Sequence, residues 1–164
     1  MNMWWKSSIA LIAIAASVVS WAEGWNVDTQ LEELASYGLS DAAPDLEGKV
    51  TLIDFWASWC APCKAAFPEM DKLQTEYGSK GFQIIAISVD QNEGHMRRFL
   101  DKQKPGFATP HDANQSVVSK AGIKVMPSSF MVDKNGVIRF AHEGWQGKKS
   151  VQKLKEEIET LLAE

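Results

Sequence analysis

The chain has 164 residues, of which 45% are hydrophobic and 23% charged, and its formal net charge at pH 7 is -4. This hydrophobic content excludes an intrinsically disordered chain, and the length is sufficient for one domain with a substantial core. The acidic balance gives no basic footprint of the kind that binds nucleic acid, so we expect no nucleic acid among the partners.

Residues 1–22 have the pattern of a secretory signal peptide. Lys6 supplies a positive charge, residues 9–19 form a short apolar segment, and Ser20-Trp21-Ala22 places small residues where a signal peptidase cleaves. The apolar segment is shorter than the roughly 20 residues that span a bilayer as a helix. We therefore expect cleavage after Ala22, export from the cytoplasm and one domain over residues 23–164. An uncleaved membrane anchor is the alternative, favoured by tryptophans near the apolar segment: Trp4, Trp5 and Trp21.

Residues 25–49 carry the weakest pattern in the chain. A short helix beginning near Asp28 or Thr29 is expected from apolar residues spaced along one helical face. These are Leu31, Leu34, Ala35 and Leu39. Residues 42–48, with Pro44 among them, predict a loop or turn.

Residues 50–57 predict a buried strand, because they are β-branched, aromatic or small apart from one charge, Asp54. Beyond Cys63 the apolar spacing changes to that of a helix that ends near Gly78. The residues that define this spacing are Ala66, Met70, Leu73 and Tyr77. The turn between the predicted strand and helix holds both cysteines of the chain, Cys60 and Cys63.

The two cysteines have the spacing of a redox pair. Cys60 lies close to the predicted helix N-terminus, where unpaired N–H groups and the helix dipole favour the thiolate and lower its pKa. Cys63 follows one turn later, within disulfide distance, so its sulfur can resolve a mixed disulfide formed by Cys60. A structural disulfide is the alternative in an exported chain with an even cysteine count. Because so short a loop stabilises little, we expect catalysis.

The segments Asp54-Phe55-Trp56-Ala57 and Trp59-Cys60-Ala61-Pro62-Cys63-Lys64, followed by Pro68, resemble the active site of thioredoxins. More narrowly, they resemble the TlpA/ResA-like branch of extracytoplasmic thiol:disulfide oxidoreductases. The resemblance implies an α/β thioredoxin fold: a central mixed sheet flanked by helices, a strand-helix insertion and a C-terminal helix. Chains of this branch usually open with a β-hairpin, which looks shortened or replaced here.

Asp54 matches the buried acid that assists proton transfer to and from the inner cysteine of thioredoxins. A buried carboxylate without a charged partner tends to have a raised pKa, which suits a general acid and base. The alternative is a structural aspartate at a strand edge that accepts a bond from a backbone N–H. Trp59 precedes the attacking thiol, and we expect it on the partner-docking surface rather than in the core.

Residues 82–89 form a near-continuous apolar run, which predicts a parallel strand covered on both faces. A helix over residues 93–102, a short strand near residues 107–109 and a helix over residues 114–121 are expected to follow. By resemblance, residues 91–110 correspond to the strand-helix insertion of the TlpA-like branch. A long loop is the alternative.

Met126-Pro127 stands at the start of an apolar strand and matches the cis-proline loop that faces the cysteine pair in thioredoxins. The family more often has glycine at Val125 and threonine at Ser128, and an ordinary trans-proline is the alternative. The client-binding residues implied by the resemblance are Trp59, Ala61, Pro62, Met126 and Pro127.

Asn135-Gly136 lies between residues 131–132 and 137–140, a strong hairpin signal that predicts two antiparallel edge strands. From Lys148 onward an apolar stripe predicts a terminal helix that covers the sheet. The stripe is Val151, Leu154, Ile158, Leu161 and Leu162, with Glu156, Glu157 and Glu159 expected outside it.

Metal binding is the competing chemistry for the cysteines. His95, His111 and His142 are scattered over different predicted elements, with no second C-x-x-C and no H-x-x-x-H. No histidine follows Cys63, which excludes the c-type haem attachment pattern. We expect no metal and no cofactor other than the redox-active disulfide Cys60–Cys63.

The sequence and the resemblance together predict an extracytoplasmic enzyme that mainly reduces disulfides of client proteins, and the resemblance implies a role in cytochrome c biogenesis or cell redox homeostasis. Ala61-Pro62 lacks the histidine that strongly oxidising DsbA-like proteins carry between their cysteines. A disulfide oxidase or isomerase is the first alternative, and a redox-inactive binding module for apocytochrome or a metal is the second. The expected partners are disulfide-bearing clients, with apocytochrome c as a candidate, and an upstream membrane thiol reductant. We expect the protein to be a monomer.

Overall fold

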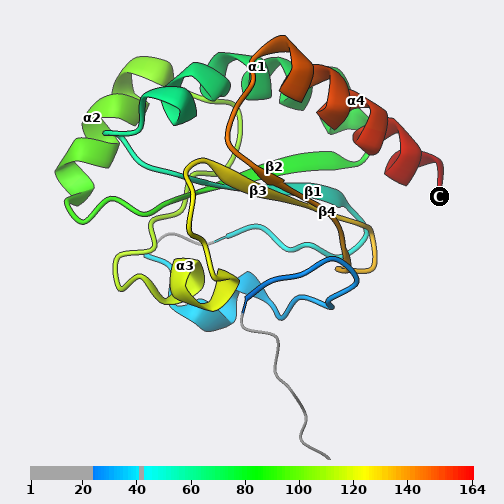
Figure 1. Ribbon diagram of the computed structural model, residues 1–164, viewed down its shortest axis with the longest axis horizontal. Coiled ribbons are helices and arrows are strands. Elements are labelled where there is room, and N and C mark those ends of the chain that lie inside the picture. The colour runs from blue at the N-terminus through cyan, green and yellow to red at the C-terminus, as the bar shows by residue number, and fades with distance from the viewer. Residues whose placement is uncertain (1–23, 41–42) are drawn as a thin grey trace, which may run out of the picture.

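The computed structural model describes residues 24–40 and 43–164 (Figure 1). The predicted signal peptide and its cleavage site lie outside the described residues. Within the described ranges, no helix combines the length and the hydrophobicity needed to cross a membrane.

The core is a mixed sheet of four strands in the order β2-β1-β3-β4. β1 and β2 pair in parallel, whereas β3 pairs antiparallel with both β1 and β4. This confirms the predicted central mixed sheet. The strands are β1 (Val50–Trp56), β2 (Phe82–Ser88), β3 (Ser128–Val132) and β4 (Ile138–Glu143).

The prediction that both hairpin strands lie at an edge is wrong for β3. This strand is paired on both sides, and only β4 is an outer strand. Phe130-Met131-Val132 is a continuous apolar run that is buried throughout, as expected of an interior strand covered on both faces.

Helices cover both faces of the sheet (Figure 1). α1, α2 and α4 lie over one face, and α3 lies over the other together with the N-terminal segment. Phe99 of α2 packs against Phe67 of α1 and Trp56 of β1, which fixes α2 close to the start of α1. The α-helices are α1 (Ala61–Tyr77), α2 (Glu93–Gln103), α3 (Ser116–Ala121) and α4 (Lys148–Ala163), and the 3-10 helices are η1 (Leu34–Tyr37) and η2 (Gly78–Lys80).

The prediction of a helix that begins near Asp28 or Thr29 is wrong. η1 is the only helical element between residues 24 and 40, and Asp28 has a φ of 67°, which interrupts a helix. The backbone N–H of Asp28 instead donates to the carbonyl of Ile138 at 2.8 Å, and the N–H of Ile138 donates to the carbonyl of Thr29 at 2.9 Å. This segment therefore lies along the outer edge of β4.

The insertion after β2 is confirmed in its helix, α2, but not in its strand. Residues 107–109 do not form a continuous strand. The chain instead makes isolated parallel bridges, Ala108 with Ile85 and His111 with Ser88, along the outer edge of β2. The expected helix over residues 114–121 is shortened to α3.

α4 is confirmed as an amphipathic helix that buries Leu154, Ile158 and Leu161. The prediction that Glu157 faces solvent is wrong, because this residue is only 5% exposed. Its carboxylate lies 2.9 Å from Nε2 of His142 on β4, and this tertiary partner accounts for a charged residue on the buried side.

Candidate active site

Cys60 and Cys63 lie at the junction of β1 and α1, as the sequence predicts. Cys60 is the N-cap of α1, and its sulfur accepts a hydrogen bond from the backbone N–H of Cys63 at 3.3 Å. The two cysteines are joined in a disulfide with a Cα–Cα distance of 5.3 Å. Pro62 lies in the first turn, where a missing N–H costs no hydrogen bond of the helix. A thiolate at Cys60 therefore meets the N-terminal amides of α1.

The surface around the disulfide is formed by its neighbours rather than by its sulfurs. Cys60 is only 5% exposed and Cys63 is fully buried in this oxidised state. Trp59 is 67% exposed, and Ala61 and Pro62 are exposed as well. Of the five predicted client-binding residues, Trp59, Ala61 and Pro62 therefore form the exposed surface next to the disulfide, whereas Met126 is half-buried and Pro127 is buried.

The Met126-Pro127 peptide bond is cis, as the resemblance implies. Ser128 is opposite Phe55 in the antiparallel pairing, so Pro127 lies beside the end of β1, from which the chain runs on to Cys60. The Pro127 carbonyl accepts from the N–H of Gly144 at 2.7 Å. Among the described residues, no hydrogen bond is formed by the backbone of Met126, so its N–H and carbonyl have no internal partner.

Asp54 lies in the middle of β1, between Ala86 of β2 and Ser129 of β3. It is 4% exposed, and its Oδ2 atom has no hydrogen-bond partner among the described residues. Burial raises the pKa of Asp54 well above its ordinary value. The alternative of a strand-edge aspartate bonded to a backbone N–H is not found, and the carboxyl has the properties of a group that takes up and gives back a proton.

Asp90 is a residue of the site that the sequence reasoning did not single out. Its carboxylate accepts from the backbone N–H of Ser58 at 2.9 Å and from the Ser58 hydroxyl at 2.7 Å. The Ser88 hydroxyl donates to it at 3.0 Å. Asp90 is 1% exposed. Its hydrogen bonds to Ser58 fix the loop that carries Trp59. An acidic residue directly after an apolar strand, next to the active-site strand, was the available signal.

The three histidines differ in their surroundings. Nε2 of His111 is 2.6 Å from the Asp90 carbonyl, and Nε2 of His142 is paired with Glu157, whereas His95 lies exposed on α2. Within the described part of the chain, no group of three or more His, Cys, Asp or Glu side chains is placed to hold a metal ion.

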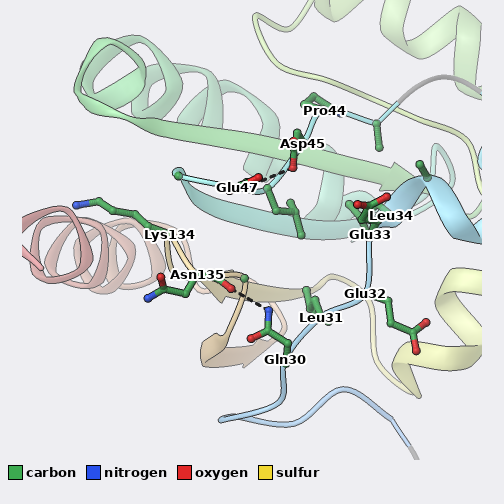
Figure 2. Close-up of a pocket in the computed structure, with 15 residues that line it drawn as sticks. Gln30, Leu31, Glu32, Glu33, Leu34, Pro44, Asp45, Glu47, Lys134 and Asn135 are labelled. Atoms are coloured by element: carbon green, nitrogen blue, oxygen red, sulfur yellow. Dashed lines mark hydrogen bonds between the residues drawn. The ribbon is translucent and has the colours of Figure 1, made fainter.

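A pocket of about 730 Å³ lies at the end of the sheet opposite the cysteines (Figure 2). It is formed by residues 30–35, residues 43–48 before β1, and the β3–β4 hairpin at residues 134–136. Cys60 follows the other end of β1. This pocket therefore lies away from the disulfide.

We expect limited alkylation of the reduced protein near neutral pH to label Cys60 well ahead of Cys63. Cys60 retains some exposure and caps α1, whereas Cys63 is fully buried. Quenched labelling followed by peptide mass spectrometry gives the two rates. Equal rates, or faster labelling of Cys63, would reverse the assignment of attacking and resolving thiols.

Known proteins match this chain over nearly all of the described domain. The sequence model of the Redoxin family matches residues 27–158. The thiol-disulfide oxidoreductase ResA of Oceanobacillus iheyensis is 35% identical over 158 residues, covering 85% of this chain and 80% of the relative. The protein of the same name from Halalkalibacterium halodurans is 32% identical over 132 residues, covering 80% and 74%.

Solved structures of related proteins superimpose on this fold. A Chlorobium tepidum protein described as a candidate DsbE thiol:disulfide interchange protein superimposes with a TM-score of 0.69 at 36% identity, covering 72% of this chain and 83% of its own. StoA from Bacillus subtilis gives a TM-score of 0.60 at 25% identity, covering 69% and 84%.

Proposed function

Because this chain belongs to the Redoxin family and is a thioredoxin-fold thiol-disulfide oxidoreductase, we propose that it acts mainly as a reductase of disulfides in extracytoplasmic client proteins. The observation that carries the proposal is the pairing of a cysteine at the N-cap of α1 with a buried second cysteine one turn later. The first sulfur can meet a client, and the second is held where only an intramolecular attack can use it.

Reduction proceeds in two exchanges. The Cys60 thiolate attacks a client disulfide, forms a mixed disulfide with one client sulfur and releases the other as a thiolate, which takes a proton. The Cys63 thiol then gives its proton to the Asp54 carboxylate and attacks the Cys60 sulfur. This restores the Cys60–Cys63 disulfide and releases the second client thiolate. Two electrons pass from the cysteine pair to the client.

Asp54 is the proton acceptor in this scheme. Its raised pKa reflects a carboxylate that water does not stabilise, and such a group accepts a proton more readily than an exposed aspartate does. The same proton returns when an upstream thiol reduces the Cys60–Cys63 disulfide again. Asp54 thus cycles between its two protonation states once per turnover.

The client lies across Trp59, Ala61 and Pro62 and beside Met126 and Pro127. The backbone of Met126 makes no internal hydrogen bond, so an extended client segment can pair with it as a short strand. Main-chain pairing of this kind depends little on client sequence. Specificity must therefore come from the surrounding side chains.

Compartment and partners follow from the N-terminal pattern and the chemistry. In this proposal the enzyme acts outside the cytoplasm after export by residues 1–22. A membrane thiol reductant supplies its electrons. Apocytochrome c is our candidate client, because its cysteines must be reduced before haem can be attached. We expect the enzyme to act as a monomer.

The redox potential of the Cys60–Cys63 couple tests the direction of the reaction. With alanine and proline between the cysteines, we expect a value nearer the roughly -270 mV of thioredoxin than the roughly -120 mV of DsbA. Equilibration with dithiothreitol buffers followed by alkylation of free thiols measures it. A value near that of DsbA would support an oxidase. An intact pair that does not reduce an uncharged disulfide peptide would support a redox-inactive binding module.

A further inference from the structure

Two adjoining hollows flank the active site on the side of α2. One has a volume of about 470 Å³ and lies between Trp59, Asn92 and His95. The other has a volume of about 310 Å³, and His95 borders both. Together they form a continuous surface, here called the α2 groove, that begins at Trp59. The second hollow is lined by Ser58, Lys64, His95, Arg98, Phe99 and Lys102.

The α2 groove carries positive charge in a chain whose net charge is -4. Lys64, Arg98 and Lys102 are exposed, and none of the six residues of the second hollow is acidic. His95, Arg98 and Lys102 are three and four residues apart, which places them on one face of α2. Among the described residues, no ion pair involves Lys64, Arg98 or Lys102.

The carboxylates nearest in sequence do not neutralise these cations. Asp90 is buried and accepts hydrogen bonds from Ser58 and Ser88. Glu93 is paired with Arg97 on α2. Asp101 is exposed on α2 and is not among the residues that line either hollow. The groove therefore presents lysine and arginine side chains that are free to bind an anion.

The groove is held in a fixed position relative to the disulfide. The Phe99 ring lies 5.1 Å from the ring of Trp56 and 5.0 Å from that of Phe67, centroid to centroid, so α2 is packed against both β1 and α1. Trp59 borders the first hollow and directly precedes Cys60. Residues that flank the disulfide cysteine of a client bound at Cys60 can therefore reach the groove.

We propose that the α2 groove selects client segments whose disulfide cysteine is flanked by aspartate or glutamate. This inference rests on the proposed reductase function and adds a specificity determinant to it. An acidic segment is repelled by most of an acidic protein, and a cationic groove beside the reactive sulfur directs it to the productive position. Arg98 and Lys102 bind its carboxylates, while the Met126 backbone pairs with its main chain.

Three synthetic peptides with the same disulfide test the proposal: one flanked by aspartates, one by serines and one by lysines. We compare the wild type with the double variant Arg98→Glu/Lys102→Glu, which leaves Lys64 in place so that the active-site helix is unchanged. The matched control is Lys72→Glu, an exposed position on α1 about 12 Å along the helix from Lys64. Thermal melting confirms that each variant is folded.

The measured quantity is the ratio of kcat/KM for the acidic and basic peptides. We expect the wild type and Lys72→Glu to prefer the acidic peptide, and the double variant to lose about threefold to tenfold in this ratio at low salt. The preference should decline in about 0.5 M salt, because exposed charges are screened. A ratio that is the same in the wild type and the double variant would overturn the proposal. If the wild type fails to reduce the serine-flanked peptide, the reductase function itself fails.

Discussion

Cys63→Ala is expected to convert the enzyme from a catalyst into a covalent trap. The variant keeps the Cys60 thiolate and its position at the N-cap of α1 but lacks the sulfur that releases the client. The mixed disulfide therefore becomes the end of the reaction. Because an intramolecular thiol acts at a far higher effective concentration than a thiol in solution, we expect turnover to fall by about a hundredfold or more.

The trap is observed by incubating reduced Cys63→Ala with a disulfide-bonded client and separating the products on a non-reducing gel. A covalent adduct that dithiothreitol cleaves should accumulate with Cys63→Ala. Cys60→Ala should give no adduct under the same conditions. In an exporting host, mass spectrometry of the adducts would identify the clients. If both variants give the same gel pattern, Cys60 is not the attacking thiol, and non-covalent binding by both would favour the binding-module alternative.

Asp54→Asn is expected to reduce turnover by about a hundredfold at neutral pH, the lower end of what general acid–base groups contribute. The amide has the size of the carboxyl but cannot take the proton of Cys63. The pH dependence of kcat that Asp54 imposes should disappear in the variant. Rates that match the wild type from pH 6 to 9 would show that Asp54 has a structural role only.

The same variant should be more stable than the wild type at high pH. The raised pKa of Asp54 means that the folded protein binds this proton more tightly than the unfolded chain does. The stability of the wild type therefore falls as pH rises from about 4, the ordinary pKa of aspartate, towards the raised folded-state value. Asparagine does not ionise, so the advantage in Tm of Asp54→Asn should grow over this interval. Thermal melting of both proteins as a function of pH measures it.

Most of the redox centre could be predicted from the sequence because its signals are local. A strand, two cysteines and a helix follow one another within a single stretch, and the hairpin and terminal helix are likewise encoded by adjacent residues. The resemblance to thioredoxins supplied what local patterns do not, the cis bond before Pro127. The burial that raises the pKa of Asp54 was expected because residues 50–57 are otherwise almost entirely apolar.

The wrong predictions concern residues whose partners are distant in the sequence. The apolar residues that follow Asp28 and Thr29 have helical spacing. The backbone groups of Asp28 and Thr29 nevertheless form hydrogen bonds with Ile138, which no local pattern reveals. Glu157 was expected on the solvent-facing side of the terminal helix because His142, its partner on β4, was not foreseen. Asp90 directly follows the apolar run of residues 82–89, and the sequence pattern gives it no partner. Its role became visible when the fold brought Ser58 within hydrogen-bond distance.

The two outer strands of the sheet each have a segment of chain against them, Ala108 and His111 on β2 and Asp28 to Gln30 on β4. An open sheet edge presents unpaired backbone groups to which an extended segment of another protein can add as a further strand, and this is a route to aggregation. These short coverings obstruct that route, whereas the backbone of Met126 beside the disulfide stays open. In the proposed mode of client binding, strand pairing thus occurs where it leads to disulfide exchange and release, and it is hindered where it would only extend the sheet.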